Sequence, residues 1–420
     1  MARQEQENNK RKSRLARGNG LFPFAEPDPL APDTTVLSET AGIDGSHWQL
    51  CLHPFSYRRS DNPDLVSLTG VEGRTPGREH LENIFFNPAF LAASRGRMER
   101  RTIFQLVLWE VNGAERRAHF AVPLARGSGF RQREHYRALV HPFAPLGSPL
   151  FDPDAGASAI ARLADLLIKG FENGLPPLLI PLVAEGSCLE ALAVELENRK
   201  GCAIRSREEG HRAAIARRME PGAVPGRKHR RELRRLGNRL AELGEVRYEV
   251  AETPFDVLLR FEEYLLMETR TWKGRRGTSI HAMKRHAAFA RQTVSDLAAE
   301  GRCRIYSMRL DGNPLAAIIL FTMNGTYMPW KITFDEHYAR FSPGTQLMVR
   351  MTDALLAEPG FRMADSLAHT GRSWMSLLWP DEIALRTHAI AATAEEARQL
   401  VQIGQLRDRL RAIARKWLRR

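Results

Sequence analysis

The chain has 420 residues, of which 43% are hydrophobic and 26% are charged, and its formal net charge is +13. This composition is that of a globular protein, and the length predicts two domains rather than one core. No apolar run approaches the roughly 18 residues that would span a bilayer. The four cysteines lie far apart, which argues against a zinc site or a disulfide framework and predicts a reducing compartment.

Residues 1–40 are predicted to form a flexible basic arm. Met1–Gly20 is polar and basic and lacks the apolar region of a secretory signal, and Leu21–Pro32 is rich in proline. Two interpretations stay open: a solvated tail, and a tether to nucleic acid or a membrane. The predicted location is the cytoplasm.

Residues 41–222 are predicted to form an N-terminal α/β domain. Its expected elements are the strands Ile103–Val111 and Ala118–Pro123, the helix Ala157–Phe171, the strand Leu178–Leu182 and the helix Cys188–Arg199. Asn112-Gly113 predicts the turn between the first two strands. Residues 139–149 are rich in proline and glycine and are predicted to be a loop.

A strongly basic helix is predicted from residue 227. Its apolar residues fall on one face, at Leu233, Leu236, Leu240 and Leu243, and Gly244 is the expected cap. The other face carries Arg230, Arg231, Arg234 and Arg235. Those arginines indicate either a platform for a polyanion (tRNA, a lipid-linked sugar phosphate or the phosphates of CoA) or the solvated side of an inter-domain helix.

Two helices, 254–270 and 280–300, are predicted to flank a loop at Trp272-Lys273. Gly274 and Gly277 favour the loop because glycine weakens a helix. An indole beside a cation suits a sugar, an acyl chain or a carboxylate. The alternative is that Trp272 fills the core beneath the loop.

Three strands and a helix are predicted next, at Arg304–Leu310, Leu315–Phe321, Thr326–Phe334 and 343–358. Pro329 cannot donate to a strand ladder, so a bulge is expected in the third strand. Ser342 is the expected N-cap and Pro343 suits the first helical turn. The unpaired N–H groups of that turn, together with Gly344, predict an anion site.

Phe361–Leu367 is predicted to form a strand parallel to the third. Asp365 and His369 then lie near its carboxyl end, where open α/β sheets place their ligands. Together they could deprotonate an amine. A purely structural role is the alternative.

This order of elements resembles the GNAT acyltransferase superfamily, and most closely its FemAB-like branch, over residues 225–392. The resemblance rests on Trp272-Lys273, Trp330-Lys331, Asp335-Glu336, Tyr338 and Phe341-Ser-Pro-Gly344. The common phosphate loop Gln/Arg-x-x-Gly-x-Gly/Ala is missing. The resemblance implies an α/β fold of two GNAT-like halves, each a mixed, mostly antiparallel sheet flanked by helices. Residues 41–222 would be a degenerate half, 223–392 the acyltransferase domain and 393–420 a basic amphipathic helix.

The resemblance also implies a bacterial N-acyltransferase that needs no metal. An acyl-CoA donor would contact Trp330, Lys331, Ser342, Gly344, Thr345 and Gln346. An amine acceptor, such as an amino sugar or another envelope or polysaccharide precursor, would contact Trp272, Lys273 and Tyr338. The candidate bases are Asp335, Glu336, Asp365 and His369. Such an acceptor extends the predicted location to the inner membrane surface. The alternatives are an aminoacyl-tRNA-dependent transferase and a non-catalytic binding protein on a GNAT scaffold.

Limited proteolysis tests the predicted division of the chain. Protease should remove residues 1 to about 40 first and should then cut near Glu220–Arg227, because exposed polar connections are cleaved most readily. Mass spectrometry of the fragments is the measurement. Early cuts within 303–358 beside an intact 221–226 would contradict the boundary.

Overall fold

The computed structural model describes residues 35–42, 46–55, 82–127, 134–197, 199–216 and 219–404. Within them the strands are β1 (Thr35–Ala41), β2 (His47–Pro54), β3 (Ile103–Asn112), β4 (Glu115–Gly127), β5 (His135–Ala138), β6 (Leu150–Phe151), β7 (Leu178–Ala184), β8 (Ala203–Ala216), β9 (Val246–Ala251), β10 (Cys303–Leu310), β11 (Asn313–Met323), β12 (Thr326–Phe334), β13 (Met363–Asp365) and β14 (Asp381–Ala391). The helices are α3 (Pro88–Ser94), α4 (Gly156–Glu172), α5 (Cys188–Leu196), α6 (Arg227–Ala241), α7 (Pro254–Arg270), α8 (Trp272–Arg275), α9 (Lys284–Ala299) and α10 (Pro343–Ala357).

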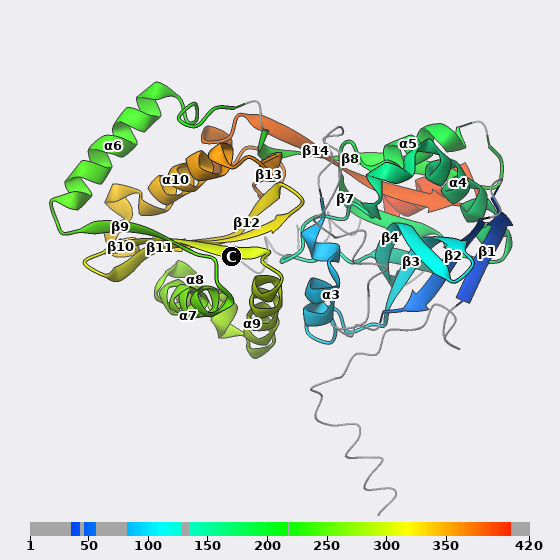
Figure 1. Cartoon of the computed structure of the whole chain (residues 1–420), viewed down its shortest axis with the longest axis horizontal. Helices are drawn as coiled ribbons and strands as arrows, with labels where there is room; N and C mark the ends of the chain where they lie inside the picture. Colours follow the sequence, from blue (N-terminus) through cyan, green and yellow to red (C-terminus); the bar gives the residue numbers. More distant parts are fainter. Residues whose placement is uncertain are drawn as a thin grey trace, which may run out of the picture.

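The described strands form one 14-stranded sheet that runs through both halves of the chain (Figure 1). The strand order is β1-β2-β3-β4-β5-β7-β14-β8-β13-β12-β11-β10-β9, with β6 paired to β4. Only the pairs β5–β7 and β12–β13 are parallel in this order, one pair in each half. The predicted fold class, a mixed and mostly antiparallel sheet flanked by helices, is confirmed.

The sheet of the C-terminal half is covered on both faces, which explains the continuous apolar run of β11. Ala317, Ile319 and Phe321 belong to the hydrophobic cluster that contains the buried residues of α7 and α9. The alternating residues Ala316, Ile318 and Leu320 belong to the cluster that contains the buried residues of α10. Successive side chains of a strand point to opposite faces, so α10 covers one face of the sheet and α7 and α9 cover the other.

The bulge predicted at Pro329 is present and it parts two parallel strands. The pairing of β11 with β12 shifts between Ile319 and Leu320, which face Lys331 and Pro329. Trp330 is therefore the extra residue on β12. β12 pairs with β13 only at its first two residues, Thr326 and Tyr327. The expected strand parallel to β12 is confirmed, and it diverges from β12 as the bulge is reached.

One strand crosses from the C-terminal half into the N-terminal half where the two halves meet. β14 comes from the C-terminal part of the chain, yet it lies between β7 and β8 of the N-terminal half. Its antiparallel pairing with β8 runs from Asp381–Ala214 to Ala391–Ala203. β8 in turn pairs with β13 of the C-terminal half. Because β13 and β14 both pair with β8, the backbone hydrogen bonds of the junction tie the two halves together.

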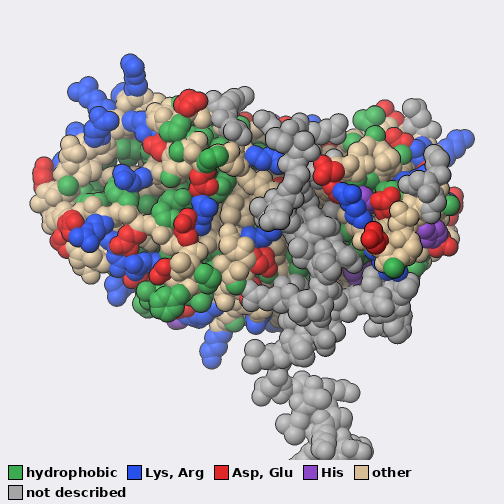
Figure 2. All heavy atoms as spheres, in the orientation of Figure 1, with side chains coloured by type: hydrophobic (Ala, Val, Ile, Leu, Met, Phe, Trp, Pro, Cys, Tyr) green, Lys and Arg blue, Asp and Glu red, His purple; other side chains and the backbone are tan. Residues whose placement is uncertain are grey.

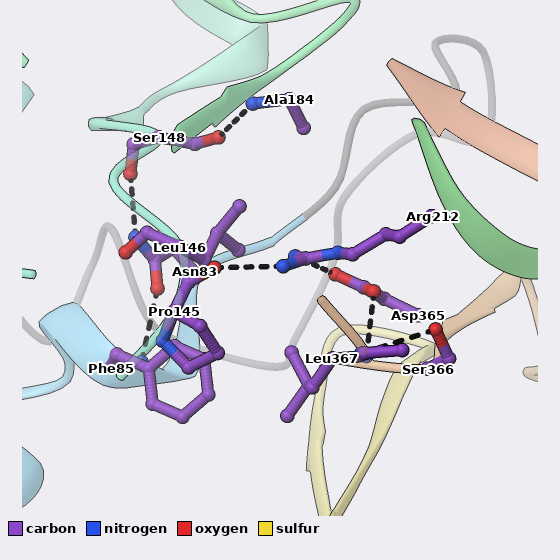
Figure 3. Close-up of polar contacts among 11 residues, drawn as sticks. Asn83, Phe85, Pro145, Leu146, Ser148, Ala184, Arg212, Asp365, Ser366 and Leu367 are labelled. Atoms are coloured by element: carbon purple, nitrogen blue, oxygen red, sulfur yellow. Dashed lines mark hydrogen bonds and ion pairs between the residues drawn. The ribbon is translucent and has the colours of Figure 1, made fainter. Parts of the chain in front are cut away.

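A buried ion pair lies at this junction (Figure 3). Arg212 of β8 donates to Asp365 of β13, and both side chains are almost completely buried. The other terminal nitrogen of Arg212 donates to the Pro145 carbonyl oxygen at 2.8 Å. The second carboxylate oxygen of Asp365 accepts from the Leu367 N–H at 2.9 Å. The pair therefore links both halves and the 139–149 loop.

Several boundaries differ from the sequence-based expectations. Residues 35–40 form β1 rather than part of an arm, because they pair with β2. The remainder of the predicted arm lies outside the described residues. In α6, Leu233 and Leu240 are buried, but Leu243 is half exposed, and the helix ends at Ala241 with Glu242, rather than Gly244, as its cap. The C-terminal helix is described over 394–404 only. The boundary at 222/223 stays a prediction.

Within the part of the chain that the structure describes, no helix is both long enough and apolar enough to cross a bilayer.

Because the ion pair is buried, a single substitution should lower the free energy of unfolding much more than a double substitution that removes both charges. Arg212→Leu leaves the Asp365 carboxylate buried without its partner, so the free energy of unfolding should fall by about 3–5 kcal/mol. Arg212→Leu combined with Asp365→Leu should recover much of that loss. Urea unfolding is the measurement, and the exposed pair Arg235–Glu232 is the control. Equal destabilisation by both variants would contradict the buried-charge explanation.

Candidate active site

A cavity of about 410 Å³ lies where the Trp272-Lys273 segment, the third predicted strand and the helix after Ser342 meet. Its walls come from the α7–α8 junction, the end of β12, the first turn of α10 and the 3-10 helix η5 (Trp374–Leu377). The lining residues are Thr271, Trp272, Lys273, Ile332, Thr333, Phe334, Glu336, Gly344, Thr345 and Trp374. The structure thus brings together Trp272 and Lys273 with Glu336, Gly344 and Thr345. Its volume falls within the range of small-molecule sites.

Trp272 lies in the one-turn helix α8, where the sequence predicted a loop, and a buried carboxylate holds this turn. Glu268 of α7 is 2% exposed, and its oxygens accept from the Lys273 ammonium at 2.9 Å and the Ile280 N–H at 2.7 Å. Gly274 lets the loop turn back, because a Cβ there would lie 1.8 Å from the Thr269 carbonyl oxygen. Trp272 itself is half exposed, so its side chain does not fill the core beneath this segment.

The first turn of α10 forms the opposite wall. Ser342 occupies the N-cap position in a left-handed conformation, with φ 53°, and its side chain makes no capping hydrogen bond. Pro343 follows in the first turn, so it adds no N–H donor there. The N–H groups of the first turn have no partner within the helix, and Gly344 and Thr345 line the cavity. The positive end of the helix dipole therefore lies at the cavity.

Gly344 packs against the sheet as well as lining the cavity. A Cβ at this position would lie 3.2 Å from Phe334 Cδ1 and 3.5 Å from Ile332 Cδ1. A bulky side chain there would press on β12 before it reached a ligand. Thr345 is therefore the better position for testing ligand binding alone.

Glu336 joins the two walls of the cavity. It begins the 3-10 helix η4 (Glu336–Phe341). One carboxylate oxygen accepts from the Trp272 N–H at 3.0 Å and the other from the Arg275 guanidinium at 2.7 Å. These two donors lower the pKa of Glu336, so the group is ionised at neutral pH. A second cavity of about 220 Å³ shares Thr271 and Glu336 with the first.

Trp330 and Lys331 do not line the larger cavity but contact the N-terminal half. The Trp330 indole N–H donates to the Phe143 carbonyl oxygen at 2.8 Å. The Lys331 ammonium lies 4.6 Å from the centre of the Phe143 ring. Burial and the neighbouring charge of Lys273 lower the pKa of Lys331 to about 8, although Glu268 acts in the opposite direction. The bulge therefore meets a loop of the other half.

The remaining predicted site residues lie outside the larger cavity. Tyr338 packs against the cluster of α10, and the Gln346 side-chain amide donates to the Phe341 carbonyl oxygen at 2.8 Å. Asp335 caps η4 and lines the smaller cavity. His369 is exposed. Asp365 accepts a hydrogen bond from Arg212 in the buried ion pair, which favours a structural role for this carboxylate over a role as a base.

The four arginines of α6 are in different environments. Arg230 donates to both oxygens of Asp353 at 3.0 and 2.6 Å, and Arg235 pairs with Glu232 at 2.7 Å. Arg231 and Arg234 are exposed. Two of the four cations are thus already partly neutralised.

Sequence reasoning missed three kinds of residue at this site. Trp374 comes from a segment that has no regular strand or helix pattern. Thr333 and Phe334 were expected only as strand residues. Phe143 reaches the bulge from a loop about 190 positions earlier in the chain. The sequence signal for Phe143 and Trp374 is weak: each is an aromatic residue in a segment without a regular strand or helix pattern.

Among the described residues, no group of three or more His, Cys, Asp or Glu side chains is placed to hold a metal ion.

Comparisons with known proteins agree with this geometry. The Acetyltransferase (GNAT) domain family matches residues 227–372. FemX is similar in structure, with a TM-score of 0.52 and 8% identity, over 80% of this chain and 96% of its own. A conserved protein of unknown function from Bacteroides thetaiotaomicron has a TM-score of 0.47 and 14% identity, over 77% and 95%. The C-terminal domain of a putative lysylphosphatidylglycerol synthetase from Agrobacterium fabrum has a TM-score of 0.43 and 14% identity, over 69% and 85%. Comparison with curated protein sequences found no match.

The match over residues 227–372 identifies a GNAT acetyltransferase domain in the C-terminal half. The chain as a whole shares the fold of FemX, and its two halves share one sheet. The likeness to FemX is one of fold, because so few residues are identical. The resemblance noted in the sequence is confirmed at this level.

The lowered pKa of Lys331 predicts a pH-dependent stability. Between about pH 8 and 10.5 the unfolded state binds a proton at Lys331 that the folded state has released, so the contribution of this residue to the free energy of unfolding rises with pH. Lys331→Met should remove that rise. Urea unfolding at pH 7.5 and pH 10 would measure the difference between variant and wild type, with the exposed Lys284→Met as control. A difference that does not change with pH would contradict the prediction.

Proposed function

We propose that this chain is an N-acyltransferase that moves an acyl group from acyl-CoA to an amine. The single observation that carries the proposal is the convergence of Trp272, Glu336 and the first turn of α10 on one cavity inside the GNAT domain. The donor is a co-substrate, and its thioester would react beside the end of β12.

The donor site is assigned to the first turn of α10. The N–H groups of Gly344 and Thr345 would bind the pyrophosphate, because a helix N-terminus favours anions. The pantetheine arm would follow β12, where the bulge at Trp330 leaves backbone groups outside the regular ladder. The missing glycine-rich phosphate loop would be replaced by the Ser-Pro-Gly turn.

The reaction needs no covalent enzyme intermediate. The acceptor nitrogen attacks the thioester carbonyl carbon, a C–N bond forms, the C–S bond breaks and the thiolate leaves. The proton that the nitrogen loses goes to a base and then to the thiolate. The protein contributes proximity and polarisation of the carbonyl.

Glu336 is the proposed proton acceptor, directly or through water. It lines the cavity, and its lowered pKa keeps it ionised at neutral pH. Asp335, at the smaller cavity, is the second candidate. Trp272 and Lys273 would cover the acceptor. An amino sugar or another envelope precursor is proposed as the acceptor from the family resemblance alone.

An aminoacyl-tRNA donor is the second candidate. The exposed guanidinium groups of Arg231 and Arg234 on α6 favour it, since they are free of the pairings made by Arg230 and Arg235. Polyanion binding at these residues should weaken steeply with salt. Titration with acetyl-CoA, a longer acyl-CoA and aminoacyl-tRNA separates the donors. No binding of any donor would support the non-catalytic alternative.

Thr345 offers a test with a matched control. Thr345→Glu places a negative charge in the first turn of α10, where it should stabilise the helix but repel a bound phosphate. Thr345→Gln has the same size without the charge. Donor affinity should be roughly tenfold or more lower for Thr345→Glu than for Thr345→Gln. Calorimetric titration measures the affinity and thermal melting checks the fold. Equal donor affinities in the two variants would refute the anion site.

A further inference from the structure

The outer face of α7 carries large apolar side chains that no other part of the described chain covers. Phe255 is 76% exposed and Leu266 is 59% exposed, and Leu258 and Leu259 lie between them in the sequence with substantial exposure. We call these four residues the α7 face. Their spacing of three, four and seven places them on one side of the helix. The opposite side, which includes Val257, Phe261 and Tyr264, is buried.

The α7 face carries little net charge of its own. Its central acidic residue, Glu262, accepts two hydrogen bonds from Arg291 of α9, at 2.6 and 2.8 Å. That exposed pair neutralises the carboxylate and shows that α7 and α9 lie side by side on this surface. The face therefore carries exposed apolar side chains on either side of a neutralised ion pair.

A strongly basic segment continues from the C-terminal end of α7. Residues 272–285 contain five cations and no Asp or Glu, namely Lys273, Arg275, Arg276, Lys284 and Arg285. The same segment exposes Trp272 and Met283. The Arg276 guanidinium lies 5.3 Å from the centre of the Trp272 ring. Figure 2 shows hydrophobic side chains gathered over the α7 and α8 region of Figure 1, with basic side chains nearby.

We propose that the α7 face and the 272–285 segment form a docking surface for an anionic phospholipid bilayer. An apolar helix face is the part that enters the headgroup region, and flanking cations are attracted to anionic lipids. A Trp beside cations is typical of the membrane–water boundary, where its ring is half apolar and half polar. The surface has all three features in one place.

Two other occupants fit these observations less well. A nucleic acid would use the cations but would leave the leucines and Phe255 exposed, since phosphate contacts dominate such binding. A symmetric dimer through this surface would bring the same basic segment of two copies close together. Lys273 and Arg275 already pair with Glu268 and Glu336, so the exposed Arg276, Lys284 and Arg285 are the cations of this segment that can attract an anionic surface. Only a lipid surface uses both these cations and the apolar side chains of the α7 face.

Docking in this way also orients the candidate active site. Trp272 lines the larger cavity and Leu266 lines the smaller one, so both cavities lie beside the docking surface. A substrate held in the membrane would reach them without leaving the interface. This consequence rests on the proposed function, whereas the docking itself does not.

Vesicle binding of the full chain tests the proposal. The probes are vesicles of phosphatidylcholine alone and of phosphatidylcholine with about one third phosphatidylglycerol, separated by sedimentation. Wild type should bind the anionic vesicles, and raising the salt concentration should weaken binding. Phe255→Ser with Leu259→Ser should reduce the partition coefficient about tenfold or more, because two inserted side chains are lost. Arg276→Glu with Lys284→Glu should reduce it similarly.

Matched controls separate this surface from others on the chain. Val194→Ser removes an apolar side chain that is 67% exposed on α5, and Arg231→Glu with Arg234→Glu reverses charge on α6. Both controls should bind vesicles like wild type. Thermal melting should show that every variant is folded.

Three outcomes would overturn the proposal. The first is that wild type does not bind anionic vesicles at low salt, and the second is that only the α6 variant loses binding. A concentration-dependent dimer, detected by light scattering and abolished by Phe255→Ser with Leu259→Ser, would assign the surface to a second copy of the chain. Acyl transfer enters none of these measurements, so failure of the proposed function would leave their result unchanged.

Discussion

The rest of the structure depends on the insertion of β14 at the junction of the two halves. β14 lies between β7 and β8, and β8 pairs with β13, so the sheet of the N-terminal half is incomplete without the C-terminal part of the chain. The Arg212–Asp365 pair is buried at the same place. Burying two charges is costly, and the cost is offset only when the partners keep one geometry. The junction therefore holds the position of β13 relative to β12, on which the candidate site depends.

The candidate site forms because β12 and β13 part. β12 leaves its partner after Tyr327, and the bulge at Trp330 follows three residues later. The first turn of α10 then lies at the end of β12, across a cavity from Trp272. Glu268 fixes the loop on the other side with hydrogen bonds from Lys273 and Ile280. Each wall is thus held by contacts outside the cavity.

The N-terminal half takes part in this arrangement although no catalytic residue is proposed in it. The 139–149 loop places Phe143 against Trp330 and Lys331 and accepts a hydrogen bond from Arg212 through Pro145. Asn83 holds the same loop by donating to the carbonyl oxygens of Leu146 and Ser148 at 3.3 and 2.8 Å (Figure 3). The N-terminal half therefore supports the bulge of the C-terminal half.

The sequence by itself determined the individual helices and strands. It also determined the part of the candidate site that is built from neighbouring segments, β12 and the start of α10. The strands β10 to β12, the bulge at Pro329 and the start of α10 near Pro343 follow from turn residues, proline chemistry and apolar periodicity, which act over a few positions. Strand β8 was not expected, because it reads as polar and charged over much of its length. Asp365 was expected at a strand end, but only its long-range partner Arg212 reveals that its carboxylate is buried and paired. Only the tertiary structure decided three features. They are the insertion of β14 between β7 and β8, the contact of Phe143 with Trp330, and the place of Trp374 in the cavity wall. They join residues that are far apart in the chain, and no local pattern records which distant residues will meet.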